Sequence, residues 1–182
     1  MRVSTAILSM SLFALVQPGL SAVDFMNDVM PVLSRLGCNG SACHGKAEGQ
    51  NGFKLSVFGH DPEGDFRALT KESRGRRVSP AAPDDSLLLR KITGEVGHGG
   101  GIRVAKGSKP YNLLRDWIRS GTPFEIENRP ALVKVRLVPA RAVMKLEARQ
   151  SLKVVAEFSD GSKRDVTWCS VFHSNDTNFR FY

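Results

Sequence analysis

The stretch Cys38-Asn-Gly-Ser-Ala-Cys43-His44 determines how the rest of this 182-residue chain is interpreted. Two cysteines followed directly by a histidine form the arrangement by which a chain attaches haem through thioethers and then supplies an imidazole to its iron. The usual spacing leaves two residues between the cysteines, whereas four separate Cys38 from Cys43. This longer turn has to bulge, and Gly40 would permit the bulge because glycine accepts backbone angles closed to other residues.

Two other interpretations of the stretch remain open. A zinc site needs four convergent ligands, yet adjacent residues such as Cys43 and His44 rarely both face one ion, and no second cysteine pair follows. A disulfide between Cys38 and Cys43 is sterically possible but leaves His44 without a role. If haem takes both of these cysteines, Cys169 is left unpaired.

The sixth position of such an iron is filled by histidine, by methionine or by no residue. We expect His98, in the glycine-rich run 94–101, because a loop just ahead of the last predicted helix would lie over the far face of the haem. His60 or an open position is the alternative. Arg76 and Arg77 are candidates to pair with the haem propionates, unless they belong to a solvated basic loop.

Residues 1–22 have the three parts of a secretory signal peptide, namely Arg2, an apolar run over 6–16 and the small residue Ala22 before the expected cut. The alternative is an uncleaved anchor or a buried helix. The apolar run is shorter than the roughly 20 residues that a bilayer crossing needs, and we expect no transmembrane segment after the signal is removed. An exported protein, periplasmic or on the cell surface, fits covalent haem attachment, which takes place outside the bacterial cytoplasm.

The net charge of +8 is spread among acidic residues along the chain. Such mixing is typical of a solvated surface, whereas a nucleic-acid interface gathers its cations into a stripe or patch. We therefore expect no nucleic-acid partner.

Apolar spacing predicts short helices before Pro123. The first would begin at Asp28 and end at Gly37, and the last would begin at Ser108 or Lys109 and end at Gly121. Between them the patterns predict a strand over 53–58 and helices over 66–72 and 87–93.

Composition changes near Pro123, which predicts a second unit. Residues 124–131 resemble a linker, and beyond them period-two alternation predicts strands over 133–137, 152–158 and 164–171, with a hairpin turn at 159–162. A seven-strand sandwich needs roughly 100 residues, so we interpret 132–182 as an incomplete immunoglobulin-like domain.

The stretch from Phe25 to Pro123 resembles the planctomycete cytochrome c domain. The matching pieces are residues 37–45, 52–56, 61–62, 75–78, 80–83, 86–87, 98–100 and 117–121. The longer cysteine spacing belongs to one branch of that family. Residues 133–176, especially Phe158-Ser-Asp-Gly-Ser162 and Asp165-Val-Thr-Trp168, are similar to a bacterial immunoglobulin-like domain of group 2. The resemblance implies haem binding and electron transfer but no named substrate.

The expected fold is thus a mainly α cytochrome c-like domain over 23–123 with a short β insertion, followed by the incomplete all-β sandwich. The expected function is one-electron transfer by one covalent haem c, with Cys38 and Cys43 as attachment sites and His44 and His98 as iron ligands. Such a protein is an electron carrier more than a catalyst, and its redox partner protein is unknown. The alternative is a non-redox binding or cell-surface module with a Cys38–Cys43 disulfide, in which the immunoglobulin-like part makes the interaction.

Overall fold

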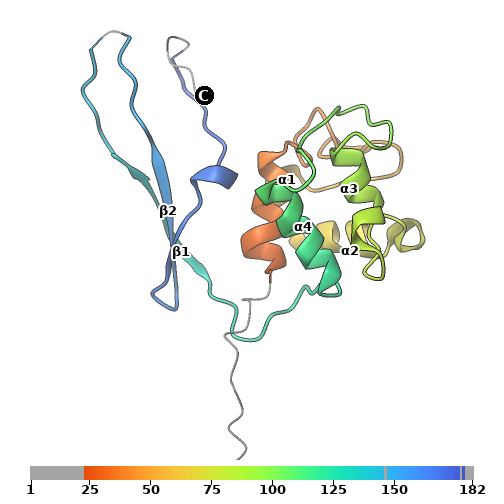
Figure 1. Ribbon diagram of the computed structural model, residues 1–182. Coiled ribbons are helices and arrows are strands. Elements are labelled where there is room, and N and C mark those ends of the chain that lie inside the picture. The colour runs from red at the N-terminus through yellow and green to blue at the C-terminus, as the bar shows by residue number, and fades with distance from the viewer. Residues whose placement is uncertain (1–22, 146, 177, 179–182) are drawn as a thin grey trace, which may run out of the picture.

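The computed structural model describes residues 23–145, 147–176 and 178, and the signal peptide expected at 1–22 lies outside them. Short α-helices form one part of the molecule and an antiparallel sheet forms the other, with residues 120–131 running between them (Figure 1). Within the described residues, no helix combines the length and the apolar character that a membrane crossing requires.

Asp24 begins the first helical segment. Its carboxylate accepts a hydrogen bond from the Asn27 N–H at 2.6 Å, and the Asp28 carboxylate accepts one from the Asp24 N–H at 2.8 Å. A π-helical turn, Phe25–Val29, therefore precedes α1 (Met30–Arg35). The predicted start at Asp28 is wrong because the wider turn accommodates Pro31, which has no N–H to donate.

Three further helices follow, and they are α2 (Pro62–Thr70), α3 (Leu87–Ile92) and α4 (Lys109–Arg119). The last two lie close to their predicted positions, whereas α2 begins four residues before the predicted start at residue 66, because Asp61 caps it and Pro62 stands in its first turn. The apolar face of α4 is buried through Leu114, Trp117 and Ile118. An aromatic cluster fills the core beside it, with ring centres 5.0 to 6.4 Å apart, made by Phe25, Phe66, Trp117 and Phe124.

The strand predicted over 53–58 is wrong. Only one isolated antiparallel bridge, between Gln50 and Phe53, occurs there, and a 3-10 turn follows at Val57–Gly59. No neighbouring strand pairs with the segment, and its Leu55 N–H donates to the carbonyl of His44 at 2.9 Å. Because Val57 and Phe58 are exposed, the alternating pattern does not describe a buried face.

The sheet contains β1 (Leu132–Val138), β2 (Lys153–Phe158) and β3 (Lys163–Asp165), in that order and antiparallel throughout. Val154, Ala156 and Phe158 of β2 are buried, whereas every residue of β1 is exposed. The central strand β2 is thus the covered one, and β1 and β3 are the two edges of the sheet.

The expected fold class is therefore wrong. The described part of the chain has four short α-helices and one three-stranded sheet. It is neither a mainly α cytochrome-like domain with a β insertion nor a sandwich of two sheets. The physical reason is that long irregular loops, around the cysteines and around the glycine-rich run, take the place of regular helix, and no second sheet covers β1 in these residues.

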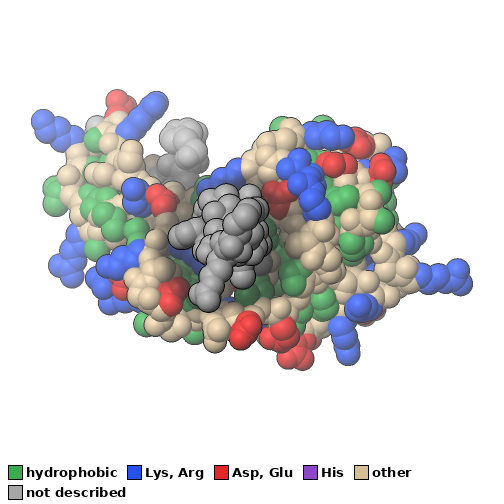
Figure 2. Space-filling view, turned by 60° about the horizontal axis from the view of Figure 1, so that its bottom comes forward, with side chains coloured by type: hydrophobic (Ala, Val, Ile, Leu, Met, Phe, Trp, Pro, Cys, Tyr) green, Lys and Arg blue, Asp and Glu red, His purple; other side chains and the backbone are tan. Residues whose placement is uncertain are grey.

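The expected linker 124–131 contacts the first helical segment through one side chain and one backbone carbonyl. Arg129 Nε lies 2.7 Å from the Asp24 carboxylate, and the Asn27 side-chain amide donates to the carbonyl of Pro130 at 2.9 Å. From the sheet, the Arg164 guanidinium reaches Asp28 at 3.4 Å. Figure 2 shows the two parts with basic and acidic side chains interspersed over both.

We predict that Asp24→Ala lowers the free energy of unfolding by about 2 kcal/mol, because it removes a helix cap and a partly buried partner of Arg129. Asp24→Asn retains an oxygen for the cap and should cost less. Urea denaturation of the two variants measures the difference. Equal stabilities of Asp24→Ala and the parent chain would contradict this role.

Candidate functional site

The loop from Gly37 to Gly45 closes on itself through backbone hydrogen bonds. The Cys38 N–H donates to the carbonyl of Leu33 at 2.9 Å, which continues the end of α1 into the loop. The His44 N–H then donates to the carbonyl of Cys38 at 3.0 Å. Cys38 and His44 are thus held at the two ends of one turn, despite the four residues between the cysteines.

Two glycines make this turn possible, and Gly40 is not the one with unusual backbone angles. Gly37 has a φ of +75°, a conformation that favours glycine at a helix end. A Cβ on Gly45 would lie 2.1 Å from the carbonyl oxygen of Asn39, so no larger residue fits there. The bulge expected at Gly40 is therefore accommodated at Gly37 and Gly45.

His44 is held by the carbonyl of Phe53. Its Nδ1 lies 3.0 Å from that oxygen, and the ring packs on the Phe53 ring with centres 4.5 Å apart. Because a carbonyl only accepts, Nδ1 must carry the proton, and Nε2 is left with a free lone pair. Burial is the main factor lowering the pKa of His44, with the nearby charges of His98, Arg77 and Lys46 acting in the same direction and the bond to Phe53 opposing them. A neutral imidazole is the form that binds a metal.

The segment that carries Phe53 is itself fixed by buried polar groups. The buried Asp65 on α2 accepts hydrogen bonds from the Ser56 N–H and the Ser56 hydroxyl, at 2.5 and 2.7 Å. Arg77 is also buried, and its guanidinium donates to the carbonyls of Ala68, Glu72 and Gly52. Arg77 thus supports the loop instead of being a free surface cation.

His98 lies in a tight turn of the glycine-rich run. Its Nδ1 is 3.2 Å from the carbonyl of Gly101, while the Gly101 N–H donates to the carbonyl of His98 at 2.9 Å. Because the Gly101 carbonyl only accepts, Nδ1 of His98 must carry the proton, which leaves its Nε2 available. Lys91 Nζ donates to the carbonyl of Gly97 at 2.5 Å and anchors the run to α3.

The two imidazoles lie close together although 54 positions separate them in the sequence. Their ring centres are 6.3 Å apart and their planes are 10° from parallel. Two imidazoles bound to opposite sides of one metal ion, through bonds of about 2 Å, would have centres about 6 Å apart. The distance between the ring centres of His44 and His98 therefore matches that of a shared ion, although the near-parallel rings are stacked in this structure.

A cavity of about 610 Å³ opens around these groups. This volume is within the range of about 300–1,000 Å³ that is usual for cofactor sites. Both cysteines, both histidines and four basic residues line it, together with apolar side chains from several elements, among them Leu33, Phe53, Leu55, Leu69, Leu88 and Ile92.

The two cysteines of the motif differ in exposure, and both are free thiols. Cys38 is buried, and that burial is the main factor raising the pKa of its thiol to about 11, which the nearby Arg103 partly offsets. Cys43 is half-buried, with its sulfur 3.8 Å from Arg103 Nη2. Arg103 and the Phe53 carbonyl are the site groups that sequence reasoning missed, although Arg103 stands only two positions after the glycine-rich run.

The candidates Arg76 and Arg77 line this cavity, whereas His60 and Cys169 do not. His60 is exposed, and its Nδ1 lies 3.3 Å from the carbonyl of Val57. Cys169 is half-buried, and its thiol donates to the carbonyl of Val166 at 3.3 Å. Across the described residues, no three or more histidine, cysteine or acidic side chains converge to hold a bare metal ion. A haem iron needs fewer protein ligands, because the porphyrin supplies four.

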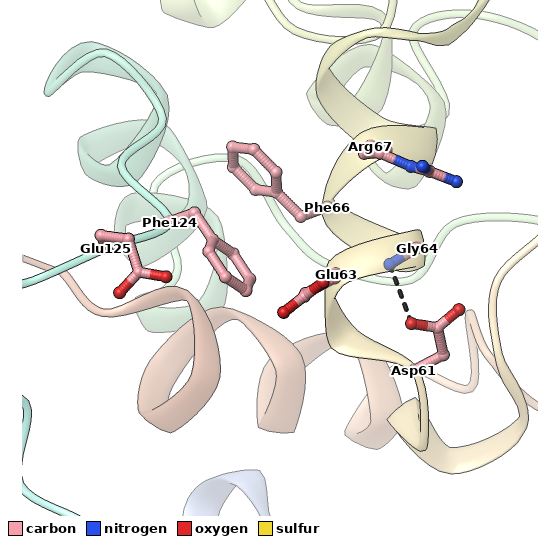
Figure 3. A pocket seen from close by; sticks show the side chains of 7 residues that line it. All are labelled: Asp61, Glu63, Gly64, Phe66, Arg67, Phe124 and Glu125. Carbon is pink, nitrogen blue, oxygen red and sulfur yellow. Dashed lines mark hydrogen bonds between the residues drawn. The ribbon is translucent and has the colours of Figure 1, made fainter.

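A second cavity of about 420 Å³ lies between α2 and residues 124–125. Figure 3 shows the rings of Phe66 and Phe124 facing each other there, with Glu63 and Glu125 at the rim. Asp61 is engaged as the helix cap, since it accepts a hydrogen bond from the Gly64 N–H at 3.0 Å. The aromatic pair belongs to the core, and the cavity contains no histidine or cysteine.

No family model matches the chain, and the searches of curated proteins and of solved structures found no significant match either. What the site can do chemically is therefore argued from its own residues. The donor set fits a covalently held haem, with two thiols for attachment, two imidazoles with available Nε2 atoms, and apolar walls with cations.

We predict that the stability of the haem-free protein falls as the pH is lowered from about 6.5, in part because of His44. An unfolded imidazole has a pKa near 6.5. The folded pKa is lower, so in this window the unfolded chain binds a proton that the folded chain does not, and unfolding becomes easier. Above the window the contribution of His44 is fully present.

Urea denaturation at several pH values, on the parent chain and on His44→Gln, tests this prediction. The variant should have a flatter dependence between pH 7.5 and about 5.5, while carboxyl groups such as Asp65 titrate in both proteins. An NMR titration of His44 with a midpoint above about 6.5 would contradict it.

Proposed function

We propose that this chain binds one haem c covalently through Cys38 and Cys43 and transfers one electron at a time, with His44 and His98 as its iron ligands. The observation that carries the proposal is the matched state of the two histidines. Each has its Nδ1 on a backbone carbonyl and its Nε2 available, and the two rings are 6.3 Å apart in a cavity that both cysteines line.

Haem, when bound, supplies a metal that gains and loses a single electron. The chain would supply attachment, orientation and burial. Phe53 fixes the tautomer and the direction of His44 through its carbonyl, and the apolar side chains of the cavity exclude water. A protein of this kind is an electron carrier more than a catalyst, exported to the periplasm or the cell surface, and it exchanges electrons with a partner protein that is still unknown.

The motif resemblance to the planctomycete cytochrome c domain, and that of 133–176 to the bacterial immunoglobulin-like domain of group 2, remain part of this proposal. Both rest on the residues alone.

A binding or cell-surface module with a Cys38–Cys43 disulfide is the second candidate. One observation favours it, namely the open strand β1, where Val133, Val135 and Leu137 are 67%, 54% and 43% exposed. Exposed apolar residues on an edge strand are a typical site for pairing with another chain.

Intact mass separates the two candidates. We expect protein matured in a periplasm to carry the mass of one haem and to give a pyridine haemochrome spectrum. Cys38→Ser and Cys43→Ser should each lose one thioether, and the double variant should lose all covalent haem. A mass lower by two hydrogens, without haem, would overturn the proposal in favour of the disulfide.

For the haem-loaded protein we predict that His98→Ala converts a low-spin six-coordinate spectrum to a high-spin one, because Nε2 of His98 is lost from the iron. His60→Ala should leave the spectrum unchanged, since His60 does not line the cavity.

The glycines beside His98 provide a finer test of the same ligand. A Cβ on Gly100 would lie 2.8 Å from Cε1 of His98, whereas one on Gly99 would meet no atom within 4 Å. Gly100→Ala should therefore weaken the low-spin signal and Gly99→Ala should preserve it. Identical spectra for the two variants would contradict the close packing of Gly100 against the His98 ring, while His98→Ala decides the ligand itself.

A further inference from the structure

The charged side chains that line the cavity are all positive. Four basic side chains line it, and no aspartate or glutamate does so among the residues that the structure describes; the basic residues are Arg76, Arg77, Lys91 and Arg103. An anionic or electron-rich group in this cavity therefore meets cations without a compensating protein carboxylate.

None of these four cations has a carboxylate within 4.0 Å among the described residues, and Arg76 is exposed like Arg103. The contact with the cysteine loop distinguishes Arg103 from the other three. Arg77 is buried and bound to backbone carbonyls, and Lys91 is bound to the carbonyl of Gly97. Arg103 Nη2 lies 3.8 Å from Cys43 Sγ and 3.3 Å from where a Cβ on Gly100 would be. Its guanidinium thus contacts the cysteine loop and reaches the His98 turn.

The backbone of Arg103 is firmly placed. Its N–H donates to the carbonyl of Ile92 at 2.7 Å, and the next N–H, that of the buried Val104, donates to the same carbonyl at 3.1 Å. The Arg103 side chain therefore extends from a fixed point at the end of α3 toward Cys43.

We propose that the positive charge of Arg103 raises the reduction potential of the haem held by Cys38, Cys43, His44 and His98. This inference rests on the proposed function. When the ferric iron accepts one electron from a donor, the charge of the site falls by one. A fixed cation nearby stabilises the reduced form more than the oxidised form.

Two properties of Arg103 make its charge effective. Its guanidinium is planar and lies beside Cys43, so the charge is held close to the attachment site. The absence of a carboxylate partner leaves the charge uncompensated. Because Arg103 is exposed, solvent and salt screen part of its field, and the effect should decrease at high ionic strength.

Spectroelectrochemical titration of the haem-loaded protein tests the proposal. We expect Arg103→Gln to make one-electron reduction about tenfold less favourable, a fall of 59 mV. Arg103→Lys keeps the charge and should restore most of the parent potential. Arg119→Gln, which removes a charge that does not line the cavity, is the matched control. The shift for Arg103→Gln should be smaller in 1 M salt than in 0.05 M salt.

The outcomes separate this inference from the proposed function. If the parent chain carries no haem, the proposed function fails. If haem is attached and Arg103→Gln keeps the parent potential, the proposed function stands and the role of Arg103 is overturned. If Arg103→Gln and Arg103→Lys lower the reduction potential equally, Arg103 has a packing role. If Arg119→Gln lowers the potential as much as Arg103→Gln, the effect comes from net charge alone. Either result overturns the proposal.

Discussion

The candidate site depends on the hydrogen bond between Nδ1 of His44 and the carbonyl of Phe53. A histidine next to a cysteine in a flexible loop could present either ring nitrogen in many directions. With Nδ1 bound to a carbonyl, the tautomer is fixed and the ring has one orientation. This bond forms only when residues 44 and 53 lie next to each other. Other contacts must therefore hold the intervening loop in a closed conformation.

Those contacts use polar groups that are costly to bury. Asp65 and Arg77 are both buried, and each has several hydrogen-bond partners that compensate for the loss of water. Asp65 fixes Ser56 on one side of Phe53, and Arg77 fixes Gly52 on the other, with its guanidinium 4.5 Å from the centre of the Phe53 ring. The short helix α2 contributes to the site because it carries Asp65 and because its Ala68 carbonyl accepts from Arg77.

The sequence predicts the parts of this molecule whose cause is local. The extents of α3 and α4 follow from apolar spacing and from Gly94 and Gly121 beyond their ends, although neither Ser86 nor Ser108 makes a side-chain cap hydrogen bond. The pairing of β2 with β3 follows from the hairpin turn at 159–162, but the strand predicted over 164–171 is too long, because β3 ends at Asp165 and a 3-10 turn follows at Thr167–Cys169. The sequence does not predict the irregular segment 53–58, because alternation describes a strand only where a partner strand exists. The cysteine and histidine candidates are visible in one motif, whereas Arg103 and Phe53 join the site through contacts between distant segments, which no local pattern reveals.

His44 and His98 are held in place by different numbers of contacts. His44 stands in a loop that is closed at both ends, beside an aromatic ring, and the glycine after it leaves no room for a Cβ. His98 stands in a run where Gly97, Gly99 and Gly101 have open space around them, and its turn is secured mainly by one backbone hydrogen bond and by Lys91. Fewer contacts have to break before the His98 turn moves than before the His44 loop moves. The free energy needed to displace His98 is therefore lower. If the two imidazoles share one iron, the His98 side is the one on which the bond is expected to open first.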